Sequence, residues 1–237
     1  MSVQNPGFLH YNGEFINNEF TGTGTFLYEN SDIYKGCFKG GLKNGRGIYK
    51  YANGDYYDGN WLNDEKNGQG VYKTSDGCEY TGDWQQSQRT GKATLKFMNG
   101  DKYQGEFIDG KFEGQGEFFF ADKRVFTGVW KNNEIDGNGV LKFPDGRKWV
   151  GEFKKGLMNG KGTIEFEDGS IYEGEIVSGL PCGFGIMRYK NGDFYKGNMN
   201  EGNKHGNGTM RYYNDTPIVQ STYQGEFFND KKHGTGK

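Results

Sequence analysis

The fold is decided by residues 57–77, which read YDGNWLNDEKNGQGVYKTSDG. An aromatic residue, a glycine and a second aromatic residue stand at alternate positions, Tyr57, Gly59 and Trp61. A polar stretch separates this run from a second extended run, and the next aromatic opener is Tyr80. Because alternate residues of a strand share one face, the stretch predicts two β-strands joined by a turn.

The aromatic opener recurs at a constant step of 23 residues, at positions 11, 34, 57, 80, 103, 126, 149, 172 and 195. The tenth opener, Tyr223, follows after 28 residues, so five residues are inserted near residues 214–221. A fixed period of this length is the signature of a repeat protein. We therefore predict a lead-in over residues 1–10 and a repeat array over residues 11–237, with an incomplete last unit.

Most of the 42 glycines occupy fixed columns of this repeat. One column follows each opener by two residues, a second follows the turn, and a third comes two residues later and fails only at Ala93. A glycine in a strand leaves room for a neighbouring aromatic ring, which can then lie on the sheet itself. A single sheet could bury its rings in this way without a second layer.

Asn-Gly and Asp-Gly pairs, such as Asn53-Gly54 and Asp76-Gly77, close many of the units. These pairs favour type I′ hairpin turns, in which both central residues have positive φ. We therefore expect them to join one hairpin to the next. The predicted fold is all-β, an elongated single-layer antiparallel β-meander of about ten 23-residue hairpins, with about nineteen strands and almost no helix.

Composition and charge narrow the function classes. Aromatic residues make up 16% of the chain, which is too many for a disordered segment, although hydrophobic residues reach only 32%. A net charge of −2 offers no basic footprint for nucleic acid and little attraction to anionic lipid. Cys37, Cys78 and Cys182 form no CxxC pair, and the N-terminus has no apolar signal region, which favours a cytoplasmic protein.

The sequence contains no convincing motif for catalysis or metal binding. Residues 105–111 resemble a phosphate-binding loop, but Phe112 stands where Ser or Thr would hold magnesium. His10, His205 and His233 are too scattered for a zinc site or a catalytic triad. We expect a protein that is not an enzyme and that has no cofactor and no metal.

The unit YxGxW…NGxGxxxxxDG, repeated every 23 residues, resembles the MORN repeat (membrane occupation and recognition nexus). The family often has His before the second-column glycine, which here occurs only at His205 and His233. The resemblance implies a non-catalytic protein–protein scaffold of cytoskeletal or ciliary assemblies, similar to radial-spoke-head components of the axoneme. It leaves two alternatives open: a membrane or phospholipid-associated adaptor, and the targeting region of a larger enzyme such as a methyltransferase or phosphoinositide kinase.

Two surfaces are candidate partner sites. The resemblance implies that a helix or extended segment of a partner lies in an aromatic groove, unless the rings are only the core of the sheet. The residues predicted to line the groove are Tyr57, Trp61, Tyr80, Trp84, Tyr103, Phe107, Phe126, Trp130, Trp149, Phe153 and Tyr172. The second surface is the edge at residues 223–237, where we expect completion by a second copy, by another subunit or by further residues.

Overall fold

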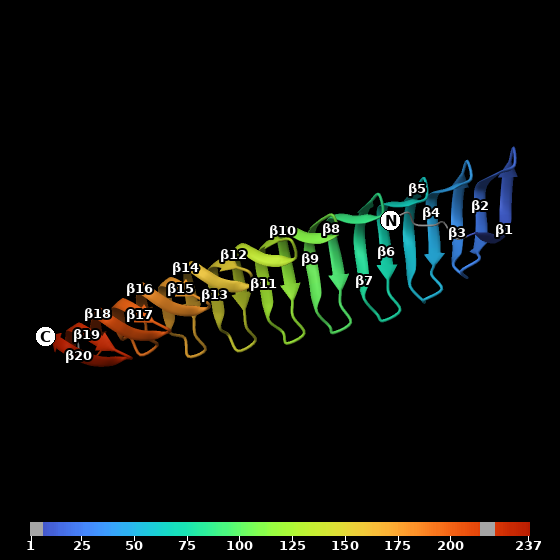
Figure 1. Ribbon diagram of the computed structural model, residues 1–237. Helices are drawn as coiled ribbons and strands as arrows, with labels where there is room; N and C mark the ends of the chain where they lie inside the picture. Colours follow the sequence, from blue (N-terminus) through green and yellow to red (C-terminus); the bar gives the residue numbers. More distant parts are fainter. Residues whose placement is uncertain (1–6, 214–220) are drawn as a thin grey trace. The chain divides into compact units, whose positions relative to one another are not determined.

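The computed structural model describes residues 7–213 and 221–237, which form strands and turns and contain no helix (Figure 1). Apart from Ser221, the insertion predicted near residues 214–221 lies outside the described residues. The chain divides into two compact units, residues 1–121 and residues 122–237.

The first unit is an open sheet in which each strand pairs antiparallel with the next strand of the chain (Figure 1). Its lead-in contributes to the first strand, which begins before the first aromatic opener. The strands are β1 (Phe8–Ile16), β2 (Glu19–Tyr28), β3 (Ile33–Lys39), β4 (Leu42–Lys50), β5 (Tyr56–Leu62), β6 (Glu65–Lys73), β7 (Glu79–Gln85), β8 (Gln88–Lys96), β9 (Lys102–Ile108) and β10 (Lys111–Phe119).

The second unit repeats this arrangement with consecutive antiparallel pairs. Its strands are β11 (Val125–Lys131), β12 (Glu134–Lys142), β13 (Lys148–Lys154), β14 (Leu157–Glu165), β15 (Ile171–Val177), β16 (Leu180–Arg188), β17 (Phe194–Asn200), β18 (Asn203–Tyr212), β19 (Ser221–Phe228) and β20 (Lys231–Gly236). The predicted single-layer meander of hairpins is confirmed in each unit. The described residues form twenty strands, in agreement with the expected number of about nineteen, and the short β20 pairs with β19.

The core of each hairpin is an aromatic ring that lies over a pair of glycines. Tyr57 is fully buried, and its hydroxyl donates to the carbonyl of Asn60 at 3.0 Å. Gly59 and Gly70 face each other across the two strands, and a Cβ on either would lie within 2.4 Å of the Tyr57 ring or hydroxyl. The glycine columns therefore make room for rings, as predicted, and the sheet buries them without a second layer.

The turns correct one prediction. The two-residue I′ turns lie inside each unit, for example at Asn63 (φ 49°) and Asp64 (φ 68°). At the predicted Asn53-Gly54 turn only the glycine has a positive φ, 91°, and the loop closes with Tyr51 N–H donating to Asp55 O at 2.9 Å. The loop therefore has three residues and a glycine bulge, because the Asn53 side chain accepts the Asp55 N–H at 3.0 Å and fixes a different turn.

The second glycine column marks a bulge in the second strand of each hairpin. Gly68 has a φ of 75°, and the register shifts between the pair Gly59↔Gly70 and the pair Trp61↔Lys66. Directly opposed residues share one face of the sheet. The bulge therefore places Lys66 beside a tryptophan, on the face that carries the rings.

Candidate partner-binding surface

The predicted groove residues form the core of the sheet in each unit. Ten of the eleven are buried, with at most 6% of each residue exposed, and Trp149 is half-buried. The buried residues are Tyr57, Trp61, Tyr80, Trp84, Tyr103, Phe107, Phe126, Trp130, Phe153 and Tyr172. Most of these rings pack edge to face on one another, as Tyr57 does on Trp61 at 5.2 Å between centroids, and all ten present little surface to a partner. A partner over this face stays a prediction.

The exposed aromatic surface of the same face belongs to a different column, which we call the closing row. Its members stand four residues after the third-column glycine, are half-buried, and lie at the ends of the second strands next to the loops. They are Tyr28, Tyr51, Phe97 and Phe120 in the first unit and Phe143, Phe166, Tyr189 and Tyr212 in the second. Thr74 interrupts the row. The column is visible in the sequence, but its greater exposure is not.

Cations stand among the rings of the first unit. Lys43, Lys66 and Arg89 occupy the same position in three consecutive hairpins, and each pairs directly with the second aromatic residue of its own hairpin. We call these three residues the cation row. Burying a lysine or arginine on an apolar face costs free energy unless its charge is paired. The partner of each cation therefore determines whether that cation is available to a ligand.

Lys43 has a carboxylate partner. Its Nζ lies 3.0 Å from Asp64 Oδ1 and 3.3 Å from the Tyr28 hydroxyl, and 13% of the side chain is exposed. Asp64 also accepts the backbone N–H of Lys43 at 2.9 Å, so the turn of one hairpin holds the cation of the preceding one. The second unit repeats this pairing, with Lys204 Nζ lying 2.9 Å from Asp230.

Lys66 occupies the equivalent ring cage without such a carboxylate. Its Nζ lies 4.5 Å from the centroid of Tyr72, 5.0 Å from Trp84, 5.2 Å from Tyr57 and 5.4 Å from Tyr51, all within the range of cation–π attraction. Burial, with repulsion from a neighbouring arginine as a second cause, lowers the pKa of Lys66 to about 8. The ammonium is therefore held in an environment that disfavours its charge.

The difference between Lys43 and Lys66 is one residue in the following turn. The backbone N–H of Lys66 donates to Ser87 Oγ at 3.0 Å, where Lys43 has Asp64. Serine fills the role of the turn aspartate toward the backbone but supplies no negative charge. Within the described part of the chain, the Lys66 ammonium has neither a hydrogen bond nor an ion pair.

Arg89 is the second cation without a carboxylate. Its guanidinium lies 5.0 Å from the centroid of Tyr80, and burial is the main cause that lowers its pKa. The turn residue equivalent to Asp64 is Gly110 here, which has no side chain. Across residues 7–213 and 221–237, Arg89 makes no side-chain hydrogen bond or ion pair. Lys66 and Arg89 thus form a local positive region on a chain whose net charge is −2.

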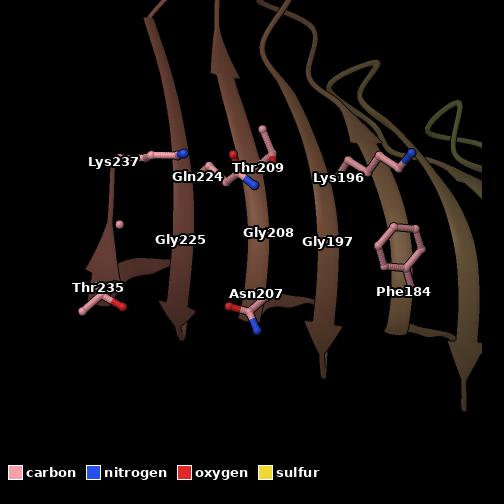
Figure 2. Close-up of a pocket in the computed structure, with 11 residues that line it drawn as sticks. Phe184, Lys196, Gly197, Asn207, Gly208, Thr209, Gln224, Gly225, Thr235 and Lys237 are labelled. Atoms are coloured by element: carbon pink, nitrogen blue, oxygen red, sulfur yellow. The ribbon is translucent and has the colours of Figure 1, made fainter.

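The opposite face carries hollows of a different kind. Figure 2 shows one at β16–β20, with a volume of about 830 Å³, a floor of glycines and Phe184, Lys196 and Lys237 around it. A similar hollow of about 720 Å³ lies in the first unit around Cys37 and Arg46. Because the hollows recur with the glycine columns, they follow from the repeat geometry and carry no special chemistry.

The remaining predictions concern metal binding, membrane spans, the histidines and the C-terminal edge. No group of three His, Cys, Asp or Glu in the described segments could hold a metal ion, and these segments contain no helix that could span a membrane. His205 Nδ1 is buried without a hydrogen bond. The edge predicted to bind a partner contains β20, whose residues are all exposed. The absence of catalysis and the completion of this edge stay predictions.

Comparison with known families identifies the repeat. The model of the MORN repeat matches ten segments, residues 11–33, 34–56, 57–79, 80–102, 103–123, 126–146, 149–171, 172–194, 195–216 and 223–237. No curated protein matches the chain significantly.

Solved structures with a similar course of the chain include a SAS-4 (dCPAP) TCP domain of Drosophila melanogaster in complex with a proline-rich motif of Ana2. It is 17% identical, covers 63% of this chain and 81% of its own, and has a TM-score of 0.40. The CPAP G-box domain is 18% identical, covers 74% of this chain and 92% of its own, and has a TM-score of 0.47. The TCP10 domain of Danio rerio CPAP is 16% identical, covers 74% of this chain and 83% of its own, and has a TM-score of 0.29. At these scores the likenesses carry no functional argument.

Proposed function

The chain belongs to the MORN-repeat family, and we propose that it is a non-catalytic protein–protein interaction scaffold of a cytoskeletal or ciliary assembly. In this proposal a helix or an extended segment of a partner binds along the ring face. The finer form of the proposal is a radial-spoke-like component of the axoneme, because the chain consists almost wholly of repeats.

The observation that carries the proposal is the half-exposed closing row on a face without a covering layer. The Phe97 ring centroid lies 6.4 Å from that of the buried Phe112, and the Phe143 centroid lies 5.1 Å from that of Trp149. Phe97 and Phe143 both keep part of their surface in contact with solvent. Contiguous aromatic surface on a soluble protein marks partner sites, and Tyr, Trp and Arg dominate binding hot spots. A partner segment would gain this surface without any rearrangement of the core.

The buried openers are the wrong residues for a test. Trp84 and Trp130 are each 5% exposed, so their substitution by alanine would remove core packing at a cost of about 3–5 kcal/mol each. Loss of binding in that double variant would not distinguish a binding site from a destabilised sheet. The closing row offers positions that a partner can reach at a smaller cost to the fold.

The test is affinity capture from ciliated cells with the full chain as bait, followed by identification of the captured proteins. The double variant Phe97→Ala, Phe143→Ala should lose cytoskeletal or axonemal partners that the unaltered chain retains. Ile48→Ala is the control, because Ile48 lies between the glycine and tyrosine of its strand and so points to the opposite face, where it is 37% exposed. Circular dichroism should show the same sheet in all three proteins. Partners that bind the double variant as well as the unaltered chain would refute the proposal.

A further inference from the structure

Five equivalent positions of the array hold a cation among aromatic side chains. Lys232, in the last strand, is exposed, and the other four fall into two pairs. At Lys43 and Lys204 a turn aspartate reaches the ammonium, at 3.0 and 2.9 Å. At Lys66 and Arg89 the same turn position holds Ser87 and a glycine, and no carboxylate reaches the cation within the described residues. The repeat itself therefore shows what occupies this position when the site is filled.

Lys66 and Arg89 are neighbours. They stand at equivalent positions of consecutive hairpins, two strands apart, so their backbones are separated by about 10 Å. The charge on Arg89 is close enough to lower the pKa of Lys66. Two like charges on one partly apolar face repel each other and attract the same kind of ligand, one with two negative groups at a similar spacing.

We propose that Lys66 and Arg89 receive two carboxylates of an acidic segment in a partner protein, a site that deepens the scaffold function proposed above and rests on it. An extended chain advances about 3.3 Å per residue, so acidic residues three positions apart match the spacing of the two cations. The partner segment then runs across the strands, with its apolar atoms against the rings around Lys66.

The internal precedents favour a carboxylate over other anions. The group that fills the equivalent position at Lys43 and Lys204 is an aspartate side chain, in the same setting of tyrosine and a paired turn backbone. The carboxylate whose charge acts on Lys66 is that of Asp55, whose oxygens accept the Tyr72 hydroxyl at 2.7 Å and the Ser75 N–H at 2.8 Å. Asp55 therefore lowers the local positive potential only in part.

A membrane fits the site less well. Binding to anionic lipid typically depends on clusters of four to eight basic residues, whereas the cation row of the first unit has only two unpaired members, on a chain of net charge −2. A peptide carboxylate can reach down between the closing-row rings, whereas a bilayer surface needs cations that project from the protein. Lys66 is instead enclosed by rings at 4.5 to 5.4 Å.

The first experiment uses fluorescein-labelled octaglutamate as the probe and the full chain as the receptor, with binding followed by fluorescence anisotropy at low salt and neutral pH. We expect saturable binding that octaglutamine does not show. Lys66→Met and Arg89→Met should each weaken binding by about tenfold or more, which is about 1.4 kcal/mol. Lys43→Met is the matched control and should leave binding unchanged, because the Lys43 ammonium already forms an ion pair with Asp64.

The second experiment supplies the missing carboxylate from within the chain. Ser87 has a φ of 61° and Asp64 a φ of 68°, so aspartate fits the backbone at this position. Ser87→Asp should pair with Lys66 and weaken octaglutamate binding by about tenfold, whereas the neutral isostere Ser87→Asn should bind like the unaltered chain. Equal binding by these two variants, or the absence of saturable binding to the unaltered chain, would overturn the site.

Vesicles of phosphatidylcholine with phosphatidylinositol bisphosphate separate the lipid alternative. Co-sedimentation that depends on Lys66 and Arg89, without octaglutamate binding, would replace the acidic peptide by a lipid headgroup and refute the inference. The capture experiment with Phe97 and Phe143 does not involve these two cations. If capture succeeds and octaglutamate fails, only this inference is wrong; if capture fails, the scaffold function is wrong whatever the peptide does.

Discussion

Replacement of Gly105 by alanine tests the physical basis of the whole array. A Cβ at this position would lie 2.4 Å from the Tyr103 hydroxyl oxygen and 2.7 Å from the Cα of Gly116. Tyr103 is fully buried and its hydroxyl donates to the Glu106 carbonyl at 3.1 Å, so the ring has nowhere to move without exposing itself. The Gly116 Cα belongs to the facing strand and cannot rotate away.

The expected loss is set by these two contacts. Overpacking of a rigid core costs about 1–3 kcal/mol, and contact with the backbone of Gly116 places Gly105→Ala at the upper end of this range. Each kcal/mol corresponds to about 4–8 °C in Tm for a cooperative unit of about a hundred residues. The control is Glu106→Gln, which changes a half-exposed side chain on the opposite face and should cost less than about 0.5 kcal/mol.

The assay is urea unfolding followed by far-UV circular dichroism, with a double-mutant cycle added. Tyr103→Ala alone should cost about 3–5 kcal/mol, but in the presence of Gly105→Ala its additional cost should be smaller, because the clashing ring is gone. The coupling should reach about 1 kcal/mol. Additive losses, or a loss from Gly105→Ala no larger than that from Glu106→Gln, would show that the ring does not depend on the glycine.

The remaining predictions concern charge and turns. Lys66→Met should raise the free energy of unfolding by about 1–3 kcal/mol at neutral pH, because the folded state lowers the pKa of Lys66 from 10.5 to about 8 and so disfavours its charge. This gain should be constant below pH 8 and shrink between pH 8 and 10.5, where the folded chain and then the unfolded chain lose the proton, as urea titrations at stepped pH would show. For the same reason octaglutamate should bind more weakly as the pH rises through about 8. Ser87→Asp should increase Tm at neutral pH relative to Ser87→Asn, since it pairs a partly buried charge. Tyr49→Phe should cost about 1–3 kcal/mol in thermal unfolding, because buried Asp32 loses the hydroxyl that donates to it at 2.7 Å.

The fold could be predicted because one pattern is repeated ten times with the same spacing. In a single hairpin, the alternation of Tyr57, Gly59 and Trp61 would leave the partner strand and the register open. The repeated glycine columns remove this freedom, because a ring on one strand needs glycine on both strands beneath it, as Gly59 and Gly70 show. Period and column together therefore fix the strand order, the shared face and the absence of a second layer.

The turns between units could not be predicted from their residues alone. An Asn-Gly pair is compatible with a two-residue I′ turn and with a three-residue loop that ends in a glycine bulge. What decides between them is the position of the closing hydrogen bond from Tyr51 N–H to Asp55 O, which depends on the register of two strands. Positive φ values inside the units fall on Asn63 and Asp64, residues that tolerate this region and carry no glycine signal.

The extent to which each ring is buried could not be predicted from the sequence either. Alternation assigns Tyr57 and Tyr51 to the same face, but only the structure shows that the first is buried over glycines while the second is half-exposed at the strand end. The glycines let an opener ring lie flat on the backbone, and this removes it from a partner's reach. The prediction of a groove therefore named the rings with the strongest sequence signal, which are the ones with the least exposed surface.

Once the fold is known, the constant period allows equivalent positions of the repeats to be compared directly, and this comparison shows which cations lack a partner. A cation is paired or unpaired according to the residue in the turn of the next hairpin, 21 positions later at Lys43 and Lys66 and 26 positions later at Lys204, where the insertion intervenes. That residue is aspartate, serine and aspartate in turn. No local pattern connects positions so far apart, yet the fold brings their side chains or backbones to about 3 Å. A repeat whose geometry is constant can thus vary its chemistry by one distant side chain, and the hairpin that keeps the cation but omits the acid is where a partner's charge can enter.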